Sequence, residues 1–362
     1  MYKVALIYNL KKEAKDPGMP DDYYSEFDSP KTISSIAQAL VAKGNEVTLV
    51  EANENLIINL KNKGPFDIAF NIAEGTNGHS RESQVPAILD FLKIPYTGSD
   101  VLALAISLDK AVTKKILRSE GILTPDFQVF SGVDEKLKAG LKFPLIVKPN
   151  SEGSAKGILA TSVVRDEKRL YQEIERVCHL YDQQILVEEF IEGMELTIAM
   201  IGNEDIRALP PMEIDFSSCK KSGEFFYSWR MKEFQGNKEM GLVPDFYCPA
   251  RLEKSIMQKV EETAKKTHRA IGCSDLSRVD IRLSKDNIPY VLEINPLPGL
   301  DPLESNFTII AKSCGMDYID LINSILNSAL KRWGIRKSRS KKAHDFPPQS
   351  LADSPSILAK NS

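Results

Sequence analysis

Residues 278–300, RVDIRLSKDNIPYVLEINPLPGL, alternate polar and apolar side chains in two runs that an Asp-Asn pair separates. Because successive side chains of a strand point to opposite faces, this pattern predicts a hairpin with one polar face. Asp280, Glu293 and Asn295 would then converge at one end of that face. Two carboxylates this close repel each other unless a cation lies between them. The pattern fits either a metal site or an ordinary solvated sheet face.

A second segment, VKPNSEGSAKG at 147–157, suits phosphate chemistry. It reads as a strand that delivers Lys148 at its end, followed by a loop of small residues. Such loops let backbone N–H groups approach a phosphate closely, and a lysine neutralises the charge. A Lys-Pro pair before a polar loop is common, so this segment indicates phosphate binding only together with other motifs.

Four segments, in this order, resemble the blocks of the ATP-grasp fold, and in particular the D-alanine–D-alanine ligases and their paralogues. They are SLDKAVTKKILRSEGILTP, FPLIVKPNSEGSAKG, ILVEEFIEGMELTI and SRVDIRLSKDNIPYVLEINPLPGL, and FNIAEG (70–75) with IPYTGS (94–99) extends the likeness toward the N-terminus. The resemblance implies an ATP-grasp fold with α/β and α+β parts and an N-terminal Rossmann-like domain. The implied boundaries are a substrate-side domain at 1–98, ATP-grasp subdomains at 99–191 and 192–335, and a disordered basic, Pro- and Ser-rich tail at 336–362.

The resemblance implies a nucleotide site in which Lys110 and Lys148 contact the phosphates of ATP. Ser154, in the loop after Glu152, would help this loop to cap the terminal phosphate. For the adenine, the resemblance implies Glu188 at the amino group and the backbones of Glu189 and Ile191 at the ring edge. Glu195 would bind the ribose. Lys232 would reach the phosphates from a mobile loop, in which Trp229 replaces the tyrosine usual in the family. Taken singly, Lys110 and Glu195 are also typical of solvated surface positions.

The resemblance also favours a metal site over a solvated sheet face for the charged residues of the hairpin. Asp280, Glu293 and Asn295 are implied ligands of two Mg²⁺ ions, which prefer oxygen ligands and share them with phosphates, and Mn²⁺ could replace them. Arg278 would lie beside the transferred phosphoryl group, and the backbone N–H of Gly299 would stabilise an oxyanion. The implied reaction is attack of a carboxylate on ATP to give an acyl phosphate, which an amine then attacks.

The segments expected to bind the amino acid differ from the family pattern. No glycine-rich loop follows the first strand, so Glu26 or Asp28 in SEFDSP (25–30) is the available carboxylate for a substrate ammonium. Glu74 stands where the family has histidine, and Ser305 lies one position from an expected serine. Two further carboxylates, Asp301 and Glu304, lie close in sequence. We therefore expect a substrate that is richer in ammonium groups, or less anionic, than alanine.

The segments that must position these residues alternate between strand and helix patterns. The strands expected in the N-terminal part are 4–8, 46–50 and 67–72, and the helices are 29–44, LIINLKNKG and 84–95. A single helix is expected from 102 to 121. The later elements expected are strands at 143–150, 185–191, 195–202 and 205–214, a helix at 252–272, the hairpin, and a final helix at 318–334.

Bulk properties narrow the class of protein. The 362 residues are 42% hydrophobic and 27% charged, with a net charge of -3, which predicts two or three globular domains and no nucleic-acid or membrane partner. The five cysteines are scattered, as in reduced cytoplasmic proteins. No apolar run is long enough for a signal or a membrane span. His79, His179, His268 and His344 have no partners in sequence that would make them catalytic.

Three functions remain open at this point. The first is a cytoplasmic D-alanine–D-alanine ligase of peptidoglycan synthesis, and the second is a ligase for another amino acid or a peptide. The third is a non-catalytic protein that binds ATP for regulation. The partners expected are small molecules, and the resemblance implies a homodimer.

Overall fold

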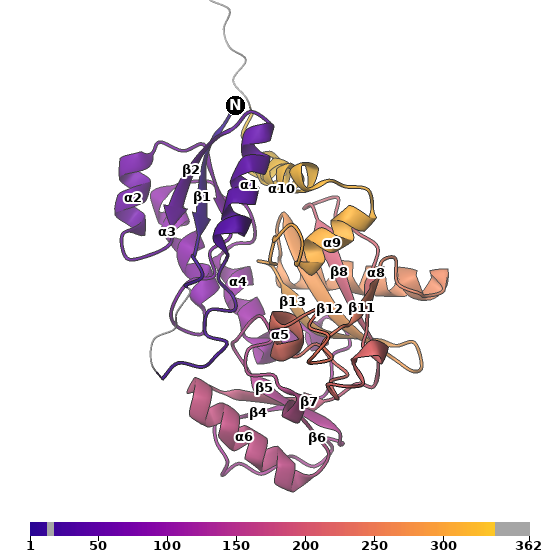
Figure 1. Cartoon of the computed structure of the whole chain (residues 1–362). Helices are drawn as coiled ribbons and strands as arrows, with labels where there is room; N and C mark the ends of the chain where they lie inside the picture. Colours follow the sequence, from indigo (N-terminus) through magenta and orange to yellow (C-terminus); the bar gives the residue numbers. More distant parts are fainter. Residues whose placement is uncertain (13–17, 337–362) are drawn as a thin grey trace, which may run out of the picture.

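The computed structural model describes residues 1–12 and 18–336, and in this part of the chain three sheets form three units around a common centre (Figure 1). The predicted tail at 336–362 falls, apart from its first residue, outside the described residues. No helix in the described ranges is both long and apolar enough to cross a membrane.

The N-terminal unit is a parallel three-stranded sheet of order β2-β1-β3. Its elements are β1 (Lys3–Tyr8), α1 (Pro30–Ala42), β2 (Glu46–Glu51), α2 (Leu56–Lys63), β3 (Ile68–Asn71) and α3 (Gln84–Leu92). The side chain of Ser29 caps α1 by accepting a hydrogen bond from the backbone N–H of Thr32 at 3.1 Å. The alternating strands and helices predicted for this part are confirmed, and the carboxyl ends of β1 and β3 lead into loops that reach the centre of the molecule.

The single helix predicted from 102 to 121 is wrong. The chain forms α4 (Val101–Leu108) and α5 (Lys110–Ser119), and Asp109 between them has an extended backbone with φ −82° and ψ 98°. Its side chain accepts a hydrogen bond from the N–H of Val112 at 2.9 Å, so an N-cap interrupts an otherwise continuous helical pattern. The break places Lys110 in the first turn of α5, where its backbone N–H donates to the carbonyl oxygen of Asn150 at 3.0 Å.

The central unit is a four-stranded antiparallel sheet of order β4-β7-β5-β6. Its strands are β4 (Phe127–Phe130), β5 (Leu145–Pro149), β6 (Val163–Val164) and β7 (Ile185–Glu189), and α6 (Glu167–Tyr181) covers one face (Figure 1). Leu170, Ile174 and Val177 of α6 are buried against this sheet. The other face turns Lys148 and Glu188 toward the centre of the molecule.

The C-terminal unit contains a six-stranded antiparallel sheet, built on β8 and the predicted hairpin. Its strands are β8 (Gly193–Ile201), β9 (Arg207–Ala208), β10 (Met212–Asp215), β11 (Asp245–Tyr247), β12 (Leu276–Ser284) and β13 (Pro289–Asn295), and its helices are α7 (Trp229–Glu233), α8 (Lys254–Ile271), α9 (Asn306–Ser313) and α10 (Tyr318–Arg332). The predicted hairpin is confirmed, with Asn287 in the left-handed conformation at its turn (φ 58°).

One hydrophobic core joins the N-terminal and C-terminal units. Ile36 and Leu40 of α1 belong to the same buried cluster as Ile322 and Leu326 of α10. Arg332, near the end of α10, forms an ion pair at 2.8 Å with the buried carboxylate of Asp275. These contacts fix the N-terminal unit over the carboxyl end of the hairpin.

Candidate active site

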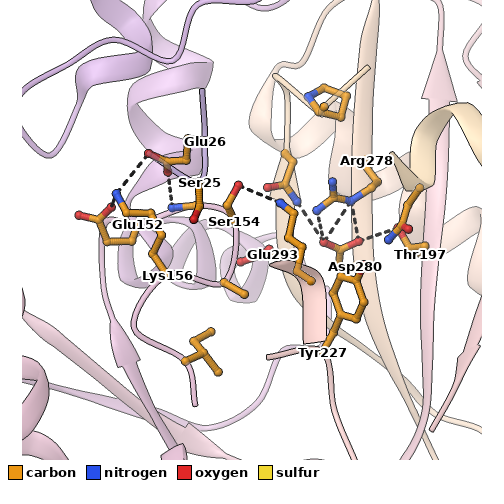
Figure 2. A pocket seen from close by; sticks show the side chains of 18 of the residues that line it. Ser25, Glu26, Glu152, Ser154, Lys156, Thr197, Tyr227, Arg278, Asp280 and Glu293 are labelled. Atoms are coloured by element: carbon orange, nitrogen blue, oxygen red, sulfur yellow. Dashed lines mark hydrogen bonds and ion pairs between the residues drawn. The ribbon is translucent and has the colours of Figure 1, made fainter. Parts of the chain in front are cut away.

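A cavity of about 450 Å³ lies where the three units meet, and side chains from each unit line it. Figure 2 shows the side of the cavity where the hairpin faces the loop that follows β5. All seventeen residues to which the sequence assigns a catalytic, nucleotide, metal or substrate role line this cavity: Glu26, Glu74, Lys110, Lys148, Glu152, Ser154, Glu188, Glu189, Ile191, Glu195, Lys232, Arg278, Asp280, Glu293, Asn295, Gly299 and Ser305.

The carboxyl end of the hairpin brings two acids, an amide and a guanidinium together. Asp280 pairs with Glu293 across the two strands, and Arg278 pairs with Asn295. Nη2 of Arg278 lies 2.7 Å from Oδ2 of Asp280, and Nδ2 of Asn295 donates to the same oxygen at 3.1 Å. The hydroxyl of Thr197 on β8 donates to Oδ1 of Asp280 at 2.7 Å (Figure 2). This network fixes the aspartate with both oxygens in the cavity.

Glu293 is the more exposed of the two acids, with a side chain 26% exposed. Burial opposes its ionisation, but Lys110, Lys148 and Arg278 outweigh this effect and lower the pKa of Glu293 to about 2. Nζ of Lys110 lies 3.7 Å from a carboxylate oxygen of Glu293. The acid is therefore ionised at neutral pH and available to a metal.

The donor set at this end of the hairpin fits a hard divalent cation. Two carboxylates and an amide offer only oxygen ligands, and the lysines beside them leave room for phosphate oxygens to complete the coordination. Within the described residues, no three His, Cys, Asp or Glu side chains form a cluster that would hold a metal alone. Two carboxylates and one amide leave coordination positions open, which suits a metal that shares its ligands with phosphate oxygens.

Lys148 lies at the end of β5, where a buried acid holds it in place. Glu188 is 1% exposed and forms ion pairs with Lys148 at 2.7 Å and with Lys114 of α5 at 2.8 Å. Burial raises the pKa of Glu188, but the two lysines outweigh it, so the pKa of this glutamate is lowered overall. Because its carboxylate is engaged by two lysines, the assignment of Glu188 to the adenine amino group stays a prediction.

The loop after β5 closes over the cavity and contacts α7. Ser154 and Ala155 have left-handed backbones, with φ of 52° and 57°. Nζ of Lys232 on α7 donates to the hydroxyl of Ser154 at 2.8 Å, and burial lowers the pKa of this lysine. Ser154, assigned to the terminal phosphate, and Lys232, assigned to the phosphates in general, are therefore in direct contact.

The segment around α7 also contacts the loop that follows β1. Nε1 of Trp229 donates to the hydroxyl of Ser25 at 2.9 Å, and the backbone N–H of Trp229 donates to the carbonyl of Ile158 at 3.0 Å. Lys11 forms an ion pair with Glu233 at 3.1 Å. Three loops that are distant in sequence thus meet at the mouth of the cavity.

The residues assigned to the adenosine part lie at the junction of the central and C-terminal units. Glu195 forms an ion pair with Arg282 at 3.0 Å, but burial prevails and its pKa is raised. A carboxylate oxygen of Glu189 accepts a hydrogen bond from the N–H of Lys142 at 2.9 Å, and the N–H of Glu189 donates to the carbonyl oxygen of Asp126 at 2.9 Å, so the assignment of its backbone to adenine stays a prediction. Ile191 lines the cavity beside them.

Glu26 and Glu152, assigned to substrate and nucleotide, share a pair of cations. Nη2 of Arg81 lies 2.6 Å from Glu26 and 3.0 Å from Glu152, and Lys156 contacts both acids. The N–H of Gly153 also donates to Glu26 at 2.8 Å. Burial opposes ionisation of Glu26, but Lys156 and Arg81 prevail and lower its pKa to about 2. The carboxylate of Glu26 already has a full set of donors, and its role toward a substrate ammonium stays a prediction.

The remaining substrate residues line the cavity near the N-terminal unit and α9. The hydroxyl of Ser305 accepts a hydrogen bond from the N–H of Asp301 at 2.9 Å. A Cβ on Gly299 would lie 3.0 Å from this hydroxyl, while the N–H of Gly299 bonds to no described residue. Glu74 lies in the cavity wall, and burial together with Glu82, Glu26 and Asp28 raises its pKa.

Several functional contacts could not be found from the sequence. Arg81 was not singled out, although its position in FNIAEGTNGHSRES, next to a motif of the family, was a signal. Lys114 is completely buried, whereas its place in a charged helix is typical of a surface lysine. Glu82, the neighbour of Arg81, lines the cavity, and 8% of the residue's surface is exposed. Each depends on contacts with units that are distant in sequence.

Comparison with known proteins agrees with this geometry. Residues 116–327 match the family model described as the D-ala D-ala ligase C-terminus. A D-alanine–D-alanine ligase of Carboxydothermus hydrogenoformans is 35% identical over 312 residues, which cover 84% of this chain and 94% of the relative. An uncharacterized protein of Sinorhizobium fredii is 33% identical over 306 residues, covering 83% and 87%.

Solved structures agree as well. The D-alanine–D-alanine ligase from Bacillus anthracis, in a crystal structure with ATP, superposes with a TM-score of 0.69 at 26% identity, covering 92% of this chain and 98% of that one. The predicted family, fold class and enzymatic nature are thereby confirmed, and with them the use of ATP and a divalent metal. This chain belongs to the D-alanine–D-alanine ligase family of the ATP-grasp fold and is an ATP-dependent ligase.

Proposed function

We propose that the cavity joins a carboxylate to an amine through an acyl phosphate, with ATP and two Mg²⁺ ions bound between the hairpin and the loop after β5. The observation that supports this most is the arrangement of Arg278, Asp280 and Glu293 opposite Lys110 and Lys148 in one cavity. Acids on one side suit metal ions, and lysines on the other suit phosphates.

The residues of this chain have separable tasks in the proposed reaction. When bound, the metal ions would neutralise phosphate oxygens. Lys110, Lys148 and Lys232 would hold the phosphate chain while a substrate carboxylate attacks the terminal phosphorus and ADP leaves. Arg278 and the free N–H of Gly299 would then stabilise the tetrahedral oxyanion that forms when the amine attacks the acyl carbon. Phosphate leaves, and the amide nitrogen loses its proton.

Closure of the loops gives the acyl phosphate its protection from water. The contacts of Lys232 with Ser154 and of Trp229 with Ser25 bring three loops together at the mouth of the cavity. An acyl phosphate in water hydrolyses, so a closed site favours amide formation over loss of the intermediate.

D-alanine is the first substrate to test on the acid side, because most of the similar proteins are named for it. The second candidate is a ligase for a different amino acid or a peptide, and the acids Glu74, Asp301 and Glu304 in the cavity favour it. A purely regulatory ATP-binding protein has no use for the complete set of Lys148, Arg278 and hairpin acids.

The test is release of phosphate from ATP in the presence of Mg²⁺ with single D- and L-amino acids and then with pairs. Hydroxylamine in place of the amine would trap the acyl phosphate as a hydroxamate, whatever the natural amine is. The variant D280N/E293Q serves as the blank. Turnover with D-alanine alone would support a cell-wall enzyme, and turnover with another pair would support the second candidate. Nucleotide binding with no hydroxamate from any acid would contradict the proposed reaction.

A further inference from the structure

One end of the cavity carries four acids that lack a cationic partner. This acidic end is formed by Asp28, which precedes α1, by Glu74 and Glu82 after β3, and by Asp301 after β13. No ion pair connects any of the four with another described residue, whereas Glu26, Glu152, Glu188, Glu195 and Asp280 in the same cavity each pair with an arginine or a lysine. The acidic end is therefore distinct in its charge balance from the rest of the cavity.

Glu82 gives independent evidence that a ligand binds there. The residue is only 8% exposed, it lines the cavity, and its carboxylate makes no hydrogen bond or ion pair with any described residue. Its oxygens are not among the fully buried polar atoms that lack a partner, so they open onto the cavity, where a ligand can bind them. The neighbouring Arg81 cannot supply the partner, since its guanidinium is engaged by Glu26 and Glu152.

A second polar atom at this end also lacks a donor. Oδ1 of Asn306, in the first turn of α9, is buried and has no hydrogen-bond partner, and Asn306 lines the same cavity. Asp301 accepts hydrogen bonds only from neutral groups, the hydroxyl of Thr32 at 2.9 Å and two backbone N–H groups of its own loop. The acidic end thus offers acceptors in excess of donors.

The pKa values reflect the missing positive charge. Burial, followed by Asp301, raises the pKa of Asp28 to about 7, and Glu74 and Tyr318 are the other titratable groups near it. Burial, followed by Glu26, raises the pKa of Glu82 to about 8, although Arg81 and Lys110 oppose this and Glu293 adds to it. A cationic ligand would favour the ionised forms of these acids.

We propose, on the basis of the ligase reaction above, that the amine substrate carries a second ammonium group and that Asp28, Glu74, Glu82 and Asp301 bind it. The amine that attacks the acyl carbon must be unprotonated, so it does not need a cluster of acids. The ammonium of an amino-acid substrate has three N–H donors and can engage two or three of these carboxylates, so four acids without a cation leave acceptors for a second ammonium. Small diamines and diamino acids share the chemistry that fits the remaining acids, namely a fixed positive charge a few bonds from a nucleophilic amine.

The experiment compares amines of equal length with one and two amino groups. Hydroxamate formation first identifies an acid that the enzyme activates. With that acid, 1,4-diaminobutane is compared with butylamine, and D-lysine with D-norleucine, at pH 8. We expect kcat/KM to be at least about tenfold higher for the amine with two amino groups than for its partner with one. The pair that shows this difference tells whether the substrate is a free diamine or a diamino acid.

Variants and a binding measurement complete the test. Glu82→Gln is expected to reduce the ratio of kcat/KM between diamine and monoamine toward one, and Glu120→Gln, at the exposed residue that follows α5, to leave the ratio unchanged. Equilibrium dialysis of labelled diaminobutane and butylamine, with a non-hydrolysable ATP analogue and Mg²⁺, measures preference without turnover. Hydroxamate formation with equal use of both amines would overturn the inference and leave the ligase proposal standing. Selective binding of the diamine without any hydroxamate formation would overturn the ligase proposal and leave the inference of a second ammonium site standing.

Discussion

Arg81 holds both carboxylate oxygens of Glu26, at 2.6 Å and 2.8 Å, and these two residues lie in different loops of the N-terminal unit. The same guanidinium reaches the carboxylate of Glu152 and the carbonyl of Ser151 at 3.0 Å each. One ion-pair network therefore connects the N-terminal unit with the loop after β5. Through it, the residues proposed for the substrate and those proposed for the phosphates are mechanically linked.

Glu26→Gln should destabilise the protein, because it leaves two buried cations, Arg81 and Lys156, with Glu152 as their remaining ion-pair partner. The side chains of Glu26 and Arg81 are 3% and 8% exposed, and removing one member of such a pair costs about 3 kcal/mol. Urea unfolding at pH 7 measures the loss. The matched control is Glu192→Gln, since Glu192 pairs with Lys285 on the surface and should show no measurable change. Equal stability of Glu26→Gln and the parent would contradict a structural role for this network.

Gly153→Ala should impair the loop over the phosphates. A Cβ at this position would lie 2.6 Å from Oε1 of Glu26, so the loop must move away from the N-terminal unit. We expect the KM for ATP to rise by about tenfold, a loss of roughly 1.4 kcal/mol in binding. Gly132→Ala is the control, because nothing lies within 4 Å of its Cβ. An unchanged KM in the Gly153 variant would show that the loop does not need its contact with Glu26.

The hairpin was predictable from sequence because its signal is local. Alternation over residues 278–295 requires only that side chains take opposite faces, and the turn residue Asn287 has the left-handed conformation that suits asparagine. The small residues at 150–157 favour phosphate binding by their type, whereas the adenine-binding role of residues 188–191 came only from the family resemblance, and both roles stay predictions. Their convergence in one cavity followed from the family resemblance and not from any property of the separate segments.

The rest of the site depends on contacts between distant segments. Arg81 lies 55 residues from Glu26 and 71 from Glu152, so neither pairing leaves a local pattern. Lys114 has the helical spacing of a surface residue, yet α5 packs inward and the lysine meets Glu188. The break at Asp109 was missed because an aspartate inside a helical pattern is ordinary, and it acts as an N-cap only when the preceding helix ends there.

The stability of the ligand-free protein should fall as the pH rises from 5 to 8. Burial raises the pKa of Asp28 to about 7 and of Glu82 to about 8, so the folded state retains protons that the unfolded state releases in this range. Retained protons make the slope of unfolding free energy against pH negative. His268, whose pKa burial lowers to about 4, opposes this trend between pH 5 and about 6.5, but the two carboxyl groups outweigh this single histidine. Glu26 and Glu293, whose pKa values lie at about 2, also have the opposite effect, but their contribution is lost only below about pH 4.5.

Urea unfolding at pH 5, 6, 7 and 8 measures this slope, and Glu82→Gln should flatten it because the variant has no proton to lose at this site. Glu120→Gln should retain the slope of the parent. A parent protein whose stability is constant or increases from pH 5 to 8 would contradict the assignment of raised pKa values to the acidic end.

Trp229→Phe should uncouple ATP hydrolysis from amide formation. The indole Nε1 donates to Ser25 at 2.9 Å and is a direct contact between the segment around α7 and the loop after β1. Phenylalanine retains an aromatic ring but removes the donor, so water should reach the acyl phosphate more often. With the preferred substrates, we expect clearly more than one phosphate released per amide formed, against a ratio of one for the parent.

Trp333→Phe provides the control, because the Nε1 of Trp333 donates to the carbonyl of Tyr96, away from the cavity. If both variants keep a ratio of one, the contact does not exclude water; if both depart from it equally, the loss reflects general loosening of the fold. Uncoupling in Trp229→Phe alone would mean that the three loops at the mouth of the cavity act as its closure.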